Sequence, residues 1–210
     1  MICNILLNQI RTYKNGNYKY RLGYVVILDI NTGLRIGELL GLRWSDIDFK
    51  NRTLTVSINR IRMKNREKDA LKKYLDVDQR ATKTKSGQRK MYLNDDAYNA
   101  LQKIYEITGN EKYVLTTETH KRCGQRNLDR MLRKIAVSAG LEDKQYGFHA
   151  LRHTFASLLF ANGEDVKVVS ELLGHSDVQI TYNTYIHLID ESKRLTINKV
   201  SDIINSTTKS

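Results

Sequence analysis

Two apolar segments with helical spacing, each followed by a glycine, stand out in the C-terminal half of the chain. Within residues 148–161, apolar side chains recur every three or four positions, which predicts a helix. Its expected core face consists of Phe148, Leu151, Phe155 and Leu158. Gly163 is placed to end this helix, and a second helix is predicted over residues 165–173, with Gly174 after it. This half of the chain is therefore expected to be helical.

The remaining segments predict further helices around a small region of strands. The chain has no proline, so glycine, asparagine and aspartate mark its turns. Helices are expected over residues 4–13, 20–31, 34–42, 94–107, 125–139 and 177–187. Residues 52–58 alternate like a strand, and residues 80–84 and 88–93 flank Lys85-Ser86-Gly87 as a hairpin would. The charged residues 63–78 are expected to form an exposed excursion. The expected fold class is mainly α with a small antiparallel β-sheet (α+β).

Length and charge narrow the classes of function. The 210 residues suit one medium-sized domain, and 35 Lys and Arg against 23 Asp and Glu give a formal net charge of +12. This excess favours a polyanionic partner such as nucleic acid. No apolar run approaches the roughly 20 residues of a membrane span, and no signal peptide is recognisable. Cys3 and Cys123 lie far apart and are expected to be free thiols in a reducing compartment, the cytoplasm.

A histidine and an arginine are presented together on the helix predicted over residues 148–161. His149 and Arg152 are three residues apart and so point the same way. Arginine offers a two-pronged donor and histidine a further one, which suits a phosphate group, although a surface pair without function is the alternative. His149 and His153 also have the spacing of a zinc-binding helix. Ala150 stands where that pattern needs glutamate, so no metal site is expected.

Arg35 breaks a local rule of helix formation. If Thr32-Gly33 ends one helix, Arg35 lies in the first turn of the next, where a cation opposes the helix macrodipole. Exceptions of this kind often mark functional sites. Glu38, three residues later, is placed to hold the guanidinium group in an ion pair. An Arg–Glu surface pair is therefore the alternative to a functional arginine.

Two further segments carry reactive side chains. Lys83 precedes the predicted hairpin turn, where its ammonium group either reaches a substrate or is solvated. His175 follows Gly174, and Tyr185 comes ten residues after His175. A tyrosine has a pKa of about 10 and needs nearby positive charge to act as a nucleophile. Tyr182 is the rival tyrosine, and a core position is the alternative for Tyr185.

Together these segments resemble the catalytic domain of the tyrosine recombinases, the phage-type and transposon-type integrases. The order TGLRIGELLGLRW, TKTKSG, HALRHTFAS and LLGHS…TY is that of the family, and it spans residues 32–187. Several motifs in one order are much more specific than any one of them.

The resemblance implies how a DNA phosphate would be held. Arg35 and Arg152 correspond to the two arginines that clamp the phosphate. His149 and His175 correspond to the two histidines that hydrogen-bond it and assist proton transfer. Glu38 corresponds to a supporting residue that is not itself catalytic.

The resemblance also implies a nucleophile and a general acid. Tyr185 corresponds to the nucleophile, because TYNTYIHL resembles the family's TLDTYSH segment, in which Tyr182 takes an apolar position. Lys83 corresponds to the hairpin lysine that protonates the leaving 5′ hydroxyl, and Lys85 remains the alternative because hairpin length varies. The implied reaction forms a 3′-phosphotyrosine and uses no metal and no nucleotide cofactor.

Organisation and partners follow from the same resemblance. Residues 1–190 correspond to the catalytic domain, and residues 191–210 to a C-terminal tail, expected to form a short helix that packs on a neighbouring subunit. The core-binding and arm-binding domains of the family are expected to be absent from this chain. The expected partners are double-stranded DNA, further copies in a homo-tetramer on DNA, and an excisionase. Without DNA the chain is expected to be a monomer or weak oligomer, and no membrane is involved.

Two other functions fit part of the sequence. A helix-turn-helix module that binds DNA without catalysis accounts for residues 158–173 but leaves Arg35, Lys83 and Tyr185 unexplained. A type IB topoisomerase uses a similar arginine, lysine and tyrosine site and relaxes DNA without exchange between sites. The LLGHS…TY segment resembles integrases more closely, so site-specific recombination is the predicted function.

Overall fold

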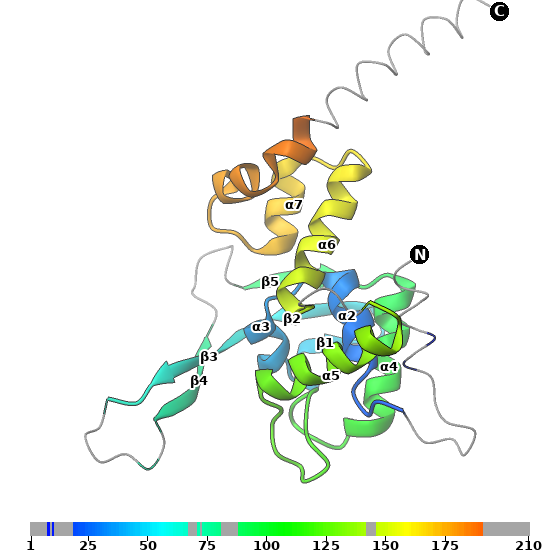
Figure 1. The fold of residues 1–210 in the computed structure, drawn as a ribbon, viewed down its shortest axis with the longest axis vertical. Coiled ribbons are helices and arrows are strands. Elements are labelled where there is room, and N and C mark those ends of the chain that lie inside the picture. Colours follow the sequence, from blue (N-terminus) through cyan, green and yellow to red (C-terminus); the bar gives the residue numbers. More distant parts are fainter. Residues whose placement is uncertain are drawn as a thin grey trace, which may run out of the picture.

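The chain folds mainly into helices, with a small three-stranded sheet and a separate two-stranded hairpin (Figure 1). The computed structural model describes residues 8, 10, 19–66, 71, 73–80, 88–141 and 146–190. Its helices are α2 (Tyr24–Thr32), α3 (Ile36–Gly41), the 3₁₀ turn η1 (Trp44–Asp46), α4 (Asp95–Thr108), α5 (Gln125–Ser138), α6 (Phe148–Ala161) and α7 (Val166–Leu173). Residues 178–190 are also helical. The predicted fold class is confirmed, whereas the tail and most of the helix predicted over residues 4–13 lie outside the described residues.

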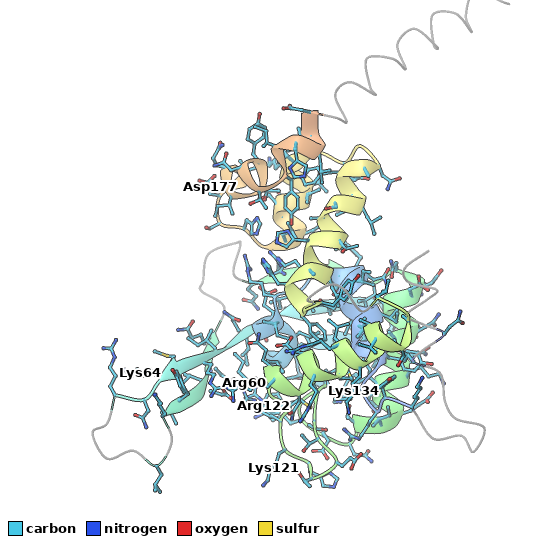
Figure 2. The ribbon with its side chains drawn as sticks, in the orientation of Figure 1. Arg60, Lys64, Lys121, Arg122, Lys134 and Asp177 are labelled. Atoms are coloured by element: carbon cyan, nitrogen blue, oxygen red, sulfur yellow. The ribbon has the colours of Figure 1, made fainter. Side chains whose placement is uncertain are left out.

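Several helix ends lie where local sequence predicts them. The Asn94 side chain accepts a hydrogen bond from the Ala97 backbone N–H (2.9 Å) and caps α4. Gly163 and Gly174 adopt φ angles of +84° and +65° after α6 and α7, a conformation that favours glycine. Asp177 accepts a bond from the backbone N–H two residues later (2.9 Å) where the helix over 178–190 begins (Figure 2). These helices are therefore bounded by short-range interactions.

The strands form two separate antiparallel sheets. The first sheet has the order β1 (Ile47–Asp48), β2 (Thr53–Val56) and β5 (Arg89–Tyr92). The second pairs β3 (Ile58–Lys64) with β4 (Tyr74–Arg80) in a hairpin that projects from the body (Figure 1). The predicted strand 52–58 is thus split between β2 and the start of β3.

The two expectations about this region have different outcomes. The exposed excursion predicted over residues 63–78 is confirmed for its described residues, which mostly belong to the projecting β3–β4 hairpin and are exposed along β4. Residues 81–87 of the hairpin predicted from residues 80–84 and 88–93 lie outside the described residues, so that hairpin stays a prediction; within the described residues, Arg80 pairs with Ile58 and β5 pairs with β2. A strand exposed on both faces has no apolar alternation by which a sequence pattern would reveal it.

Charged side chains tie the hairpin to itself and to the body. Arg60 Nη2 donates to the Asp76 carboxylate across the hairpin (3.2 Å). Nη1 of Arg122 donates to both oxygens of Asp78 (2.9 and 2.7 Å). Figure 2 shows Arg60 and Arg122 near the base of the hairpin and Lys64 farther out along it. Charge pairing therefore replaces apolar burial along these strands.

Two apolar clusters form the core, and α6 passes through both. The larger cluster contains α2, which is buried at seven of its nine residues and packs on α4 and α6. Phe148 and Leu151 belong to this cluster, whereas Ala156 and Phe160 belong to a smaller cluster with α7 and Tyr185. Leu158, expected on the core face, is 51% exposed because α7 covers another side of this half of α6. No described helix is long and apolar enough to cross a bilayer.

Candidate active site

Arg35 is the N-cap residue of α3, and Glu38 compensates its charge. The Arg35 backbone N–H donates to Glu38 Oε2 (2.8 Å), and its Nη1 donates to Oε1 (2.9 Å). Glu38 therefore caps the helix and holds the guanidinium, which removes the conflict between Arg35 and the macrodipole. Nη2 of Arg35 donates to the Gly174 carbonyl (2.8 Å). The Arg35 side chain is still 38% exposed, so the guanidinium is accessible to a ligand.

Arg152 is buried on α6 and ties two distant turns together. Its Nη1 donates to the Gly33 carbonyl (2.6 Å) and its Nη2 to the Leu173 carbonyl (2.7 Å). Burial, together with the charge of Arg35, lowers the pKa of Arg152 to about 10, so the group stays charged at neutral pH. Because residues 173 and 174 are adjacent, Arg35 and Arg152 meet at the same turn after α7.

A third arginine, Arg89 on β5, forms a buried fork with Glu38. Arg89 Nη1 and Nη2 donate to Glu38 Oε1 and Oε2, each at 2.9 Å, and Nε donates to the Leu172 carbonyl (3.0 Å). Burial raises the pKa of Glu38, but the hydrogen bonds and charges of Arg89 and Arg35 outweigh burial and lower it to about 2. Arg89 is a site residue that the sequence motifs did not predict. Arg89 lies two residues before the apolar Met91, so the alternation of a strand places both side chains on the same, buried face. This alternation was the available sign that Arg89 is buried.

His175 lies next to Arg152 and is held in one tautomer. Its Nε2 is 3.1 Å from Arg152 Nη2, and its Nδ1 is 2.7 Å from Thr181 Oγ1. Arginine can only donate, so Nε2 accepts, and Nδ1 carries the proton and donates to Thr181. Burial and the charges of Arg152 and Arg35 lower the pKa of His175 to about 4. The imidazole is therefore neutral at pH 7.

Tyr185 is buried in the smaller apolar cluster and is hydrogen-bonded to His153, a residue to which the family resemblance gave no role. Its Oη lies 2.7 Å from His153 Nδ1, and His153 Nε2 lies 2.9 Å from His149 Nε2. The Tyr185 ring also packs on Phe160, with ring centroids 5.3 Å apart. Burial raises the pKa of Tyr185 while Arg152 opposes the rise, so the phenol is protonated at neutral pH. The sequence suggested only a zinc-ligand role for His153, although its i, i+4 spacing from His149 already predicted that the two rings lie side by side on one helix.

Asp29 on α2 is a buried acid that interacts electrostatically with Arg152 and Glu38, and it was not among the predicted site residues. It is fully buried, and neither carboxylate oxygen has a hydrogen-bond partner among the described residues. Burial raises its pKa well above the ordinary value, although the charge of Arg152 partly opposes this. Burial thus disfavours the ionised form of Asp29, whereas Glu38 is the paired counter-charge to Arg35 and Arg89.

The structure brings most of the predicted site residues together. Arg35, Arg152 and His175 share the turn after α7, while His149 and Tyr185 are linked through His153. Lys83 and Lys85 lie outside the described residues. A groove of about 520 Å³ borders this turn, lined in part by Arg89, Gly174 and His175. This cluster of guanidinium and imidazole groups is suited to hold a phosphate beside a tyrosine hydroxyl.

Relatives of known type match nearly the whole chain. Residues 6–192 match the model of the Phage integrase family. The chain is 34% identical over 209 residues to a tyrosine recombinase XerC-like protein of Caldanaerobacter subterraneus subsp. tengcongensis, over 93% of this chain and 53% of that protein. It is 28% identical over 216 residues to the integrase of Staphylococcus phage L54a, over 93% of this chain and 58% of that protein. The chain thus spans about half the length of the curated relatives it matches.

Solved structures share the fold. The Tn1549 transposon integrase in complex with circular intermediate DNA matches with a TM-score of 0.72 and 25% identity, over 95% of this chain and 65% of that one. The XerA recombinase matches with a TM-score of 0.65 and 22% identity, over 93% of this chain and 61% of that one. The sequence and structural matches cover the same nearly complete span of residues. The chain therefore belongs to the phage integrase family of tyrosine recombinases.

Proposed function

We propose that this domain cuts and rejoins double-stranded DNA at specific sites through a covalent 3′-phosphotyrosine on Tyr185. The observation that carries the proposal is the meeting of Arg35 and Arg152, far apart in sequence, at one turn beside His175. The hydrogen bonds given above use only part of the five N–H donors of each guanidinium, so donors remain for a phosphate. The homologous Tn1549 integrase was crystallised with DNA, and the charge of +12 suits the same kind of partner.

In the proposed reaction, the Tyr185 oxygen attacks the scissile phosphorus in line. The bond from phosphorus to the 5′ oxygen breaks, and the leaving oxygen takes a proton from the hairpin lysine, Lys83 or Lys85. The phosphotyrosine conserves the bond energy, so a 5′ hydroxyl from another duplex rejoins the strands without ATP. Arg35 and Arg152 stabilise the charge on the non-bridging oxygens as it is redistributed in the transition state.

A suicide-substrate experiment tests this function. The chain is incubated with an end-labelled pool of nicked duplexes of randomised sequence, and covalent adducts are isolated and mapped. We expect an adduct at Tyr185, its loss in Tyr185→Phe with DNA affinity retained, and its persistence in the matched control Tyr182→Phe. Arg152→Ala is expected to block the adduct by removing a phosphate clamp. An adduct that persists in Tyr185→Phe would contradict the assignment.

The same experiment separates the alternatives. DNA binding without any adduct from the unaltered chain favours the non-catalytic helix-turn-helix module. An adduct together with relaxation of supercoiled plasmid, but no exchange between sites, favours a topoisomerase-like activity. Exchange of strands between two duplexes supports recombination.

Assembly on DNA is part of the proposal. Residues 1–190 act as the catalytic unit in the cytoplasm, and four copies assemble on DNA with residues 191–210 contacting a neighbouring subunit. An excisionase sets the direction of the reaction. Crosslinking with and without duplex DNA is expected to give tetramers only in its presence, and deletion of residues 191–210 is expected to reduce them. Equal crosslinking in both conditions would contradict this assembly.

A further inference from the structure

A pair of histidines connects the buried Tyr185 to the surface of α6. Tyr185 Oη lies 2.7 Å from His153 Nδ1, and His153 Nε2 lies 2.9 Å from His149 Nε2. His149 is exposed, whereas Tyr185 is buried. The family resemblance gives roles to His149 and Tyr185 but none to His153. The hydrogen-bonded path therefore runs from the proposed nucleophile to a proposed phosphate ligand through a residue without an assigned role.

Packing fixes the rings along this path. His149 and His153 are one helical turn apart on α6, and their rings meet edge to face with centroids 4.4 Å apart. The His153 and Tyr185 rings lie 5.6 Å apart, and Phe160 supports the far side of the tyrosine. Both nitrogens of His153 are thus engaged, one by the phenol and one by the second imidazole. This is the arrangement that a proton relay requires.

The protonation states set the direction of the hydrogen bonds. Burial raises the pKa of Tyr185, so its hydroxyl carries a proton. Burial and the nearby His149 and Arg152 lower the pKa of His153, so this ring is neutral. The groups that act on His153 are His149 and Arg152 on its own helix and Tyr185 from the helix over 178–190. With Tyr185 as donor, Nδ1 of His153 accepts, its Nε2–H donates to His149 Nε2, and His149 carries its proton on Nδ1.

We propose that His153 is a further catalytic residue, which takes the proton of Tyr185 during attack and passes a proton on to His149. This inference rests on the proposed function. The O–H bond of Tyr185 breaks and its proton goes to Nδ1, while the proton on Nε2 moves to His149, which becomes an imidazolium. The freed electron pair of Oη forms the bond to phosphorus, and the electron pair of the broken bond leaves with the 5′ oxygen. Rejoining reverses each transfer.

The relay also moves a positive charge to His149, beside the proposed phosphate site. The phenol proton stays on His153, and the proton that His153 passes on ends on His149, one turn before Arg152 on the same helix. A positive charge thus forms beside the proposed phosphate site during attack, when the phosphate is gaining a bond. The buried interior is left without an unpaired charge, which a low-dielectric site would disfavour.

The variant His153→Asn tests the relay. The asparagine carbonyl oxygen keeps an acceptor near the position of Nδ1, so it can hold Tyr185 but cannot take its proton. Adduct formation is measured in single turnovers on duplexes with an ordinary 5′ oxygen and with a 5′-bridging sulfur, which leaves without a general acid. We expect a fall of roughly 100-fold at pH 7 on both substrates, and a smaller deficit at high pH, where hydroxide ionises the tyrosine.

Matched controls and outcomes make this test decisive. His120→Asn makes the same change at an exposed histidine whose ring contacts Glu111 and no site residue, and it is expected to leave the rate unchanged. Unchanged or faster reaction in His153→Asn would overturn the relay, and a faster one would show that the contact restrains Tyr185. A deficit that is equal at every pH would also overturn it, since a purely positional role has that signature. Thermal unfolding and DNA affinity report whether the variant folds.

A second measurement needs no variant and no DNA. Nitrogen-15 spectra of the unaltered chain at neutral pH are expected to show His153 protonated on Nε2 and His149 on Nδ1. Protonation of His153 on Nδ1 would overturn the relay even if Tyr185 forms the adduct. Absence of an adduct at Tyr185 in the unaltered chain would instead refute the proposed function. The two failures are therefore distinguishable.

Discussion

Replacing Arg89 with methionine removes the buried fork that holds Glu38. The Arg89 and Glu38 side chains are only 7% and 6% exposed, and two hydrogen bonds of 2.9 Å join them. Methionine is long enough to fill much of the space but donates no hydrogen bond. In Arg89→Met, Glu38 keeps only its bonds to Arg35, and the Leu172 carbonyl loses the donor that Nε supplies.

The pKa of Glu38 gives the size of the effect. Lowering this pKa from 4.5 to about 2 corresponds to about 3 kcal/mol of stabilisation of the folded, ionised state. Removal of one partner from a buried ion pair ordinarily costs about 3–5 kcal/mol, because a charge is left buried without compensation. We therefore expect Arg89→Met to lower the free energy of unfolding at pH 7 by about 3 kcal/mol.

The pH dependence provides a second sign of the same interaction. The folded-state pKa of Glu38 lies below its unfolded value, so its stabilisation is complete above pH 4.5 and is lost as the pH falls toward 2. In Arg89→Met this acid-dependent loss is expected to shrink, because the main partner that lowers the pKa is gone. The two proteins should therefore differ most at neutral pH and converge in acid.

Urea unfolding followed by circular dichroism, at pH 7 and at several acid pH values, measures both quantities. Arg62→Met, at an exposed arginine on β3, is the matched control and is expected to change stability by less than about 0.5 kcal/mol. The double variant Glu38→Gln/Arg89→Met is expected to recover part of the loss, because the buried carboxylate left without Arg89 is itself removed. A loss below about 1 kcal/mol in Arg89→Met, or an unchanged acid dependence, would refute the reasoning.

Three further expectations follow from the structure. Asp29→Leu is expected to stabilise the fold by about 1–3 kcal/mol and so to raise the melting temperature, because neither carboxylate oxygen of Asp29 has a hydrogen-bond partner among the described residues. A lower melting temperature would contradict this. Gly174→Ala is expected to cost about 2 kcal/mol or more in urea unfolding, since its φ is +65° and an added Cβ would overlap the Arg89 guanidinium; a neutral effect would count against that overlap. DNA affinity, measured by fluorescence anisotropy, is expected to fall steeply from low to moderate salt with little dependence on sequence, because phosphate contacts release counterions. A salt-independent affinity would argue against a phosphate-dominated interface.

Local chemistry in the sequence determined where several helices end and which residues are reactive. The Asn94 cap and the glycines at 163 and 174 act within a few residues of the helix ends, so the printed sequence contains the whole interaction. The order of the motifs around Arg35 and Arg152 identified the family, because each motif is a short contiguous segment. The net charge likewise needs no fold to be read, and it indicated a polyanionic partner.

The tertiary structure alone decided which distant groups meet. The pairing of β5 with β2 joins chain segments far apart in sequence, and no local pattern specifies it. The burial of Arg89 against Glu38, 51 residues away, depends on that pairing. The hydrogen bond between Tyr185 and His153 depends on how the helix over residues 178–190 packs against α6. Helix ends are fixed by neighbours in the chain, whereas buried charges and proton paths are fixed by neighbours in space, which only the folded chain brings together.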